Sequence, residues 1–411
     1  MTYARRLLRM STMSGSPNAA NRKMRQHVRF ASTPSCAAGR AGLSRPTGSL
    51  TTVIHPIILR LTTRPMNLPP VTLDLDALRL NLLRQKQPAR VHMFEHGVAD
   101  EVKDELDRRF SLAQSITAAR GTPEFRWQRD VAVQRFIGSE LLRVWLPGAE
   151  FAVAGSRGIT WGEEHAGPIQ TWEDIEKYDW PKPEAINWAE LEWHERHLPP
   201  DMGIIHVVKV WEVVRELLGF ETFCFKLHED PAFVDEVIRR VGEFHLALTR
   251  GLCDFRRVFA VYAADDYAYK TATMFAPQTV VEKFLPWHRR MSAHAHERGK
   301  LLFFHCCGKA DAIMDALIDD VKIDAKHSFE DTVVPVTEAK RLWGRRVALL
   351  GGLDVDFIVR ADEVAIRRRV RETLDVCQPG GGYCLGLGNW VTSYIPANNY
   401  LAVLDEARKY S

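Results

Sequence analysis

Three consecutive residues with reactive side chains, His305, Cys306 and Cys307, directly follow the apolar run 301–304. Four apolar residues are too few for a globular helix but suit a strand buried on both faces, and apolar residues at helical spacing begin after Gly308. The reactive residues therefore come at the carboxyl end of a strand, where ligands and catalytic groups collect in parallel α/β folds. Because residues two apart in a strand share a face, we expect His305 and Cys307 to point together and Cys306 to point toward the helices.

An imidazole and a thiolate on one face can provide two ligands of a tetrahedral zinc site. His305 and Cys307 are therefore predicted metal ligands. The alternative is a buried strand end with a hydrogen-bonded histidine, since free cysteine is often buried simply as a small apolar group. Cys384, in a later strand-like run, is a third candidate ligand, and packing in the core is its alternative.

Polar residues also follow other strand-like runs. A catalytic role, as acid, base or a group that orients a ligand, is predicted for Asp265, His327 and Glu330. Contacts with the substrate are predicted for Glu95, His96, Asp266, Tyr267, Lys270, Asp354 and Asn389. The alternative for these positions is an ordinary surface loop, and for Asp354 it is a bond to the backbone amides of its own turn.

The elements that must position these residues are eight strand-like runs, mostly separated by helical stretches. They cover residues 91–94, 141–146, 203–210, 258–264, 301–304, 323–325, 347–350 and 382–387. This order predicts an α/β fold, a single (β/α)8 TIM-type barrel over residues 66–411, with extra N-terminal helices and a hairpin insertion at 151–161. An open doubly wound sheet is the alternative.

Residues 1–65 hold eleven Arg or Lys residues and no acid. This composition predicts a disordered extension, which is either an organelle transit peptide or the product of an over-extended start before Met66. The rest of the chain has 44 basic and 52 acidic residues, a net charge of −8, which argues against nucleic-acid binding. Seven scattered cysteines favour reduced thiols in the cytoplasm, and no apolar run is long enough to span a membrane.

Several segments in a fixed order resemble the uroporphyrinogen decarboxylase superfamily between Arg90 and Tyr410. They read EDIEKYDWPKP, LLGFETFCFKLHEDPAFV, DDYAYKTATMFAP, FHCCG, LLGGLD, PGGGYCLGLGN and IPANNYLAVLDEARKY. The resemblance implies a (β/α)8 barrel. It also implies one of two activities, because the superfamily contains cofactor-free porphyrinogen decarboxylases and zinc-dependent methyltransferases that move a methyl group between a corrinoid and a thiol.

Particular residues indicate which of these two groups of the superfamily the chain resembles. The decarboxylases carry an Arg-Gln-Ala-Gly-Arg motif near the first strand, where this chain reads FEHGVAD, and a histidine on the last strand, where this chain has Asn389. The methyltransferases carry His-x-Cys on the fifth strand, which His305 and Cys307 match, and a third zinc ligand, a cysteine, at the position of Asn389. This chain therefore has two of the three zinc ligands. The predicted substitute for the third is an oxygen of Glu330, Asp265 or Glu95, and Cys384 is the other candidate.

Three hypotheses follow. The first is a methyltransferase in which zinc activates the thiol of a small-molecule substrate and the methyl donor is a corrinoid on a partner protein docked over the barrel mouth. The second is a metal-free lyase acting on a tetrapyrrole or a smaller carboxylate, with Asp265 stabilising a protonated intermediate. The third is a barrel that binds a corrinoid or porphyrin without turnover.

Overall fold

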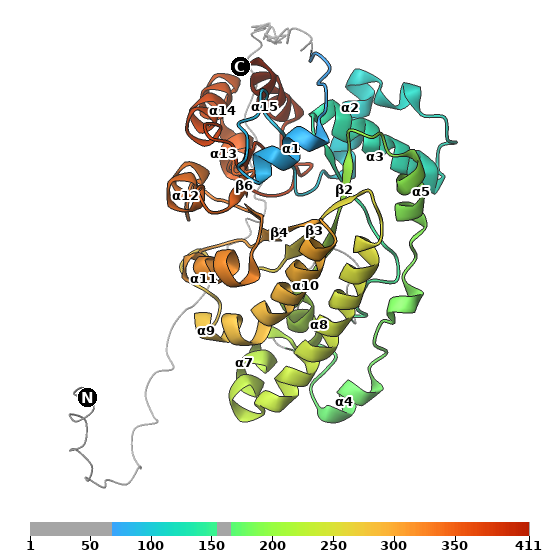
Figure 1. The fold of residues 1–411 in the computed structure, drawn as a ribbon, viewed down its shortest axis with the longest axis vertical. Coiled ribbons are helices and arrows are strands. Elements are labelled where there is room, and N and C mark those ends of the chain that lie inside the picture. Colours follow the sequence, from blue (N-terminus) through green and yellow to red (C-terminus); the bar gives the residue numbers. More distant parts are fainter. Residues whose placement is uncertain (1–67, 154–165, 411) are drawn as a thin grey trace, which may run out of the picture. The chain divides into compact units, whose positions relative to one another are not determined.

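The computed structural model describes residues 68–153 and 166–410 (Figure 1). The predicted N-terminal extension lies outside these residues. Most of the predicted hairpin at 151–161 does too, so that neither prediction is tested.

The described residues contain a sheet of seven parallel strands that are paired in sequence order. The strands are β1 (Leu141–Arg143), β2 (Gly203–Val208), β3 (Val258–Ala264), β4 (Leu301–His305), β5 (Ala325–His327), β6 (Ala348–Leu350) and β7 (Tyr383–Cys384). The predicted α/β fold with a parallel sheet is confirmed. A doubly wound sheet would reverse its strand order at a switch point, and this sheet does not.

The first predicted strand, residues 91–94, is present only as a single parallel bridge between Met93 and Leu385. The Phe94 N–H donates to the carbonyl of Leu385 at 2.8 Å, and the Leu385 N–H donates to the carbonyl of His92 at 2.9 Å. This segment therefore lies beside β7, but its regular pairing is limited to one bridge, so it does not form an eighth strand.

Helices follow most of the strands and pack against the sheet (Figure 1). The helices are α1 (Leu75–Leu82), α2 (Asp100–Phe110), α3 (Pro123–Ile137), α4 (Trp172–Lys177), α5 (Ala189–His197), α6 (Trp211–Leu218), α7 (Phe220–Glu229), α8 (Pro231–Cys253), α9 (Pro277–Thr279), α10 (Leu285–Glu297), α11 (Asp311–Ala316), α12 (Val336–Trp343), α13 (Val355–Arg360), α14 (Glu363–Cys377) and α15 (Ala397–Lys409). Asp230 caps α8 through the Phe233 N–H, with Pro231 in the first turn, as the sequence predicts. No helix among the described residues is both long and apolar enough to cross a membrane.

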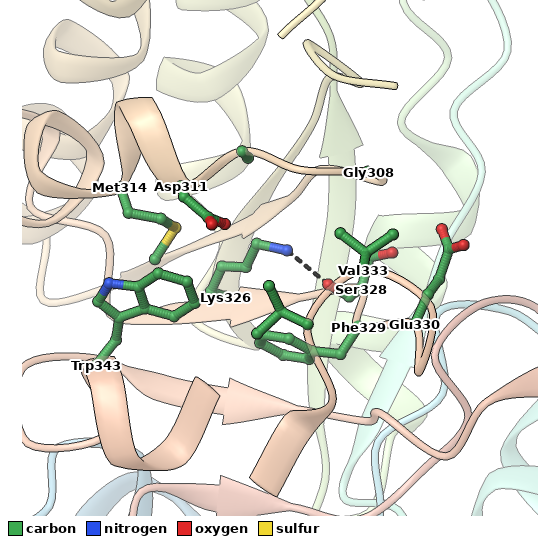
Figure 2. Close-up of a pocket in the computed structure, with 11 residues that line it drawn as sticks. Gly308, Asp311, Met314, Lys326, Ser328, Phe329, Glu330, Val333 and Trp343 are labelled. Carbon is green, nitrogen blue, oxygen red and sulfur yellow. Dashed lines mark hydrogen bonds between the residues drawn. The ribbon is translucent and has the colours of Figure 1, made fainter. Parts of the chain in front are cut away.

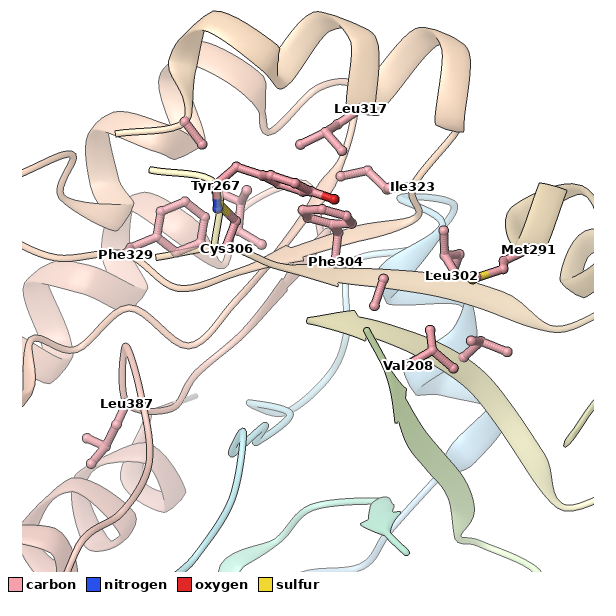
Figure 3. Packing of buried hydrophobic residues seen from close by; sticks show 14 of the residues in the cluster. Val208, Tyr267, Met291, Leu302, Phe304, Cys306, Leu317, Ile323, Phe329 and Leu387 are labelled. Atoms are coloured by element: carbon pink, nitrogen blue, oxygen red, sulfur yellow. The ribbon is translucent and has the colours of Figure 1, made fainter. Parts of the chain in front are cut away.

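The alternating faces of β4 divide the core into two clusters. Leu302, Phe304 and Cys306 face the helices and pack with residues such as Tyr267 (Figure 3). Leu301 and Phe303 face the other way, into an inner cluster to which α1 contributes Leu78 and Leu82. Side chains that continue the inner face beyond the end of β4 must therefore reach the carboxyl-end opening of the curled sheet.

Candidate metal and thiol site

His305 and Cys307 continue the inner face of β4, and their side chains meet. The Nε2 atom of His305 lies 3.3 Å from the Sγ atom of Cys307. The prediction that these two side chains point together is confirmed, and so is the prediction that Cys306 packs toward the helices. Two more groups reach the same sulfur: Ser328 Oγ donates to it at 3.3 Å and Asn389 Nδ2 at 3.5 Å. Groups at or after the ends of β4, β5 and β7 thus meet at the Cys307 sulfur, and two of them, Ser328 and Asn389, donate to it.

A carboxylate completes this group. Oδ1 of Asp266 lies 3.5 Å from Nε2 of His305 and accepts the backbone N–H of Cys307 at 2.6 Å. One ligand atom from each of Asp266, His305 and Cys307 lies within 4.8 Å of the other two. Nitrogen, sulfur and oxygen are all accepted zinc ligands, and three protein ligands with a free fourth position are the usual arrangement of a catalytic site. The residues present therefore fit a zinc ion.

Three imidazoles stack beside this group. The rings of His96 and His305 are 4.2 Å apart and nearly parallel, and the ring of His327 lies 5.0 Å from that of His305. All three are buried, and their ligand atoms also lie within 4.8 Å of one another. His305 thus belongs to two possible metal sites.

Hydrogen bonds favour the first of these sites. His327 Nε2 lies 3.2 Å from the carbonyl oxygen of Leu387, which can only accept, so this nitrogen carries a proton. Burial and the neighbouring His305 hold the pKa of His327 well below its usual value, so the ring is neutral and its Nδ1 must accept. The Nδ1–H of His305 donates to it at 2.7 Å. In a neutral His305, Nε2 is then a lone pair aimed at Cys307.

The electrostatics agree with this tautomer. Burial, assisted by the charge of Lys326, lowers the pKa of His305 to about 3, so this imidazole stays neutral at physiological pH. Burial, and next the carboxylate of Asp266, raises the pKa of Cys307 well above its usual value. A bound divalent cation reverses this effect on a coordinating thiol, because it favours the thiolate directly. Without such a cation the thiol is protonated and inert.

Lys326 holds the ends of β4 and β5 in place. Its ammonium is buried and donates to the carbonyl oxygens of Cys306, His327 and Ser328 at 2.9, 2.9 and 2.6 Å. Figure 2 shows this side chain between Trp343 and Ser328, with Glu330 turned away from it. Since all three donors are used, Lys326 positions the site rather than reacting in it.

Several predicted site residues lie elsewhere. Asp265 is fully buried on the helix side of β3, where it accepts the backbone N–H groups of Val210 and Glu212 and pairs with His288 at 3.0 Å. Tyr267 also points into the helix layer, toward His288. The structure therefore does not bring Asp265 or Tyr267 to the metal and thiol group.

Cys384, Asp354, Glu330, Lys270 and Glu95 also lie apart from that group. Cys384 is buried in the inner cluster, where Asn81 Nδ2 contacts its sulfur at 3.8 Å. Asp354 caps α13 through a backbone N–H, Glu330 pairs with the exposed Lys270 at 3.6 Å, and Glu95 accepts from the Leu387 N–H and the Tyr400 hydroxyl. Burial raises the pKa of Glu95 to about 8, which makes it a neutral acid at pH 7.

Sequence reasoning overlooked three residues at the site. Ser328 contacts the sulfur of Cys307, Tyr262 bonds Nδ1 of His96 at 2.9 Å, and Arg143 donates to the carbonyl of His96 at 3.0 Å. A signal for two of them exists in the sequence. Tyr262 lies four residues before Asp266 in the direction of β3, and Arg143 lies two residues after the inward-facing Leu141. Period-two alternation therefore assigns Tyr262 and Arg143, together with Asp266, to the inner face.

Comparisons with known proteins agree with this architecture. The sequence model of the family described as Uroporphyrinogen decarboxylase (URO-D) matches residues 166–410. A "Uroporphyrinogen decarboxylase" from Cupriavidus necator is 36% identical over 84 residues, which are 20% of this chain and 23% of the relative, so the chain spans under a quarter of that protein.

Two solved structures are similar to this chain, and the first supports its fold. A "methyltransferase from Methanosarcina mazei" superposes with a TM-score of 0.59 at 14% identity, covering 82% of this chain and 99% of that one. A "Putative Vitamin-B12 Independent Methionine Synthase" from Listeria monocytogenes has a TM-score of 0.40 at 14% identity, with 78% and 96% covered. Since the family model matches more than half of the chain, this protein belongs to the uroporphyrinogen decarboxylase (URO-D) family.

Proposed function

We propose that this protein transfers a methyl group to the thiol of a small-molecule substrate, with a zinc ion held by His305, Cys307 and Asp266. The observation that carries the proposal is the convergence of three different zinc-ligand atoms within 4.8 Å at the carboxyl ends of β3 and β4. Asp266 takes the place of the third ligand that the resemblance assigns to the position of Asn389. A methyl-corrinoid on a partner protein is the proposed methyl donor. We also propose that residues 91–94 complete the closure of the barrel.

The zinc ion, when bound, would lower the pKa of the substrate thiol and so make a thiolate available near neutral pH. The residues of the chain prepare this site. His327 keeps the lone pair of His305 on Nε2, facing the metal position. Ser328 and Asn389 donate to the Cys307 sulfur, which favours its thiolate form, and Asp266 fixes the backbone of Cys307 through its N–H.

Metal analysis of the purified full chain tests this proposal. We expect about one zinc per chain in the wild type and loss of that zinc in His305→Ala, Cys307→Ala and Asp266→Asn variants. Cys306→Ala is the matched control, because this adjacent cysteine packs toward the helices and should leave the zinc content unchanged. A wild-type protein that takes up no zinc from zinc-containing medium would exclude the metal-dependent reaction.

A metal-free decarboxylase is the second candidate. It is favoured by the segment shared with the Cupriavidus necator protein described as a uroporphyrinogen decarboxylase. The two candidates differ in their products: decarboxylation releases carbon dioxide in the presence of a chelator, whereas thiol methylation stops when zinc is removed. Asp265, which was predicted to stabilise the protonated intermediate of this reaction, already accepts two backbone N–H groups and pairs with His288, which weakens this candidate.

A further inference from the structure

The structure contains a cavity that shares no lining residue with the metal and thiol site. It lies between the carboxyl ends of β1 and β2 on one side and helices α6 and α8 on the other, with about 810 Å³ of empty space. Its walls are largely apolar, with contributions from Val144, Leu146, Val207, Val213 and Leu248. Such a mixture of an apolar wall and a few polar groups is typical of pockets for small organic ligands.

Two cations line this cavity. Arg143 ends β1 and Lys209 follows β2, and in the part of the chain that the structure describes no carboxylate lies within 4.0 Å of either charged group. Arg143 donates to the carbonyl of His96 and its guanidinium stacks on Trp390, and neither contact neutralises its charge. Burial lowers the pKa of Arg143, which reflects the cost of holding this charge away from water without an anion.

A buried histidine also lines the cavity. His245 on α8 lines the cavity, is 4% exposed, and neither of its ring nitrogens has a partner among the described residues. Burial lowers its pKa to about 3, so the neutral ring offers one N–H donor. His206 is held by the carbonyl of Val144 at 3.0 Å through Nδ1. A buried donor without a partner costs free energy that a bound acceptor would recover.

The carboxylates that line the cavity do not supply this acceptor. Glu150 uses one oxygen on the indole N–H of Trp145 at 3.1 Å and the other on the backbone N–H of Gly148 at 2.7 Å. Glu216, on α6, is not within ion-pair distance of Arg143 or Lys209. Among the described residues, Arg143 and Lys209 therefore have no ion-pair partner next to the apolar wall.

We infer that this cavity binds a small organic acid, with its carboxylate at Arg143 and Lys209 and its apolar body against the wall of α6 and α8. The same molecule would place its reacting group at His305 and Cys307, because Arg143 links the cavity to His96, whose ring stacks on His305. The inference rests on the proposed function for the identity of this acid as the substrate. Binding of the acid itself depends only on the cavity.

Calorimetric titration of the full-length protein tests the inference, with 4-phenylbutyrate as the probe and the uncharged 4-phenylbutanol as its isosteric control. We expect the acid to bind the wild type at least about tenfold more tightly than the alcohol, which is about 1.4 kcal/mol. Lys209→Met should remove most of this difference, whereas Lys209→Arg, which keeps the charge, should retain it. Thermal unfolding of both variants checks that they fold.

A Cys307→Ala variant separates the two proposals. It should still bind 4-phenylbutyrate, which carries no thiol to contact the metal and thiol site, as the wild type does, even if the metal-dependent reaction proves wrong, because Cys307 does not line the cavity. Equal affinity for acid and alcohol in the wild type, no binding of the acid, or wild-type affinity in a folded Lys209→Met protein would each overturn the inference.

Discussion

Replacing His327 by phenylalanine tests the role of the histidine pair. His327 is fully buried and accepts the Nδ1–H of His305 at 2.7 Å. Phenylalanine keeps the ring shape but offers no acceptor. The buried N–H of His305 then stays unpaired, at a cost of about 1–3 kcal/mol, or the ring moves its proton to Nε2 and loses the lone pair aimed at Cys307. Either outcome should weaken zinc binding by about 10- to 100-fold, which corresponds to about 1.4–2.7 kcal/mol.

Competition for zinc against a chromophoric chelator measures this change on the purified protein. His327→Asn is the matched control, because the amide oxygen of asparagine can stand close to the position of Nδ1 and accept the same proton. We expect His327→Asn to keep most of the wild-type affinity. Thermal unfolding of both variants in chelator separates a loss of metal affinity from a loss of fold.

Two results would refute this reasoning. Unchanged zinc affinity in a folded His327→Phe protein would mean that the tautomer of His305 does not matter. Complete loss of zinc in His327→Phe together with full zinc in Cys307→Ala would place the ion among His96, His305 and His327, which also bring their ligand atoms within 4.8 Å.

Three further predictions concern stability. The Asp265→Asn variant should lose about 3 kcal/mol of unfolding free energy in urea, because it breaks a buried pair with His288. Its zinc content should stay unchanged, and a stable variant without zinc would contradict this prediction. Burial raises the pKa of Glu190 to about 7, whereas the usual pKa of this group is 4.5. Between these values the folded protein holds a proton that the unfolded chain has released, so the free energy of unfolding falls as the pH rises. Glu190→Gln should therefore gain up to roughly 3 kcal/mol over the wild type between pH 4 and pH 8, and a pH-independent difference in unfolding would contradict it. Gly386→Ala should cost about 3 kcal/mol, because an added Cβ would lie 1.8 Å from the carbonyl oxygen of Phe94, and wild-type stability in urea would show that residues 91–94 do not pack closely on β7.

Much of the fold follows from periodicity in the sequence. Seven of the eight predicted strands are present and pair in parallel order, because continuous apolar runs between helical stretches suit a parallel sheet covered by helices. The eighth, residues 91–94, is reduced to a bridge at Met93, although its apolar pattern resembles that of the others. Regular pairing depends on the neighbouring backbone, which is not encoded within the segment itself.

The candidate site, too, was predicted only in part from the sequence. The shared face of His305 and Cys307 follows from alternation within one strand, and so does the outward position of Cys306. Which aspartate joins them was not read from the sequence: Asp265 was predicted to be catalytic, but Asp266 reaches His305 while Asp265 caps the start of α6. The two aspartates lie about forty residues before His305. Alternation along β3 places Asp266 on the inner face, and the parallel pairing of β3 with β4 brings it to His305.

By itself the sequence determined which residues could do chemistry and on which face of β4 they lie, because a strand imposes its period of two on every side chain it carries. The tertiary structure alone decided which groups from other strands meet them. It stacked His96 and His327 on His305, directed Ser328 to the sulfur of Cys307, and placed Arg143 beside a largely apolar cavity. Such contacts depend on how neighbouring strands are aligned in the curled sheet, and no local pattern in the chain contains that alignment.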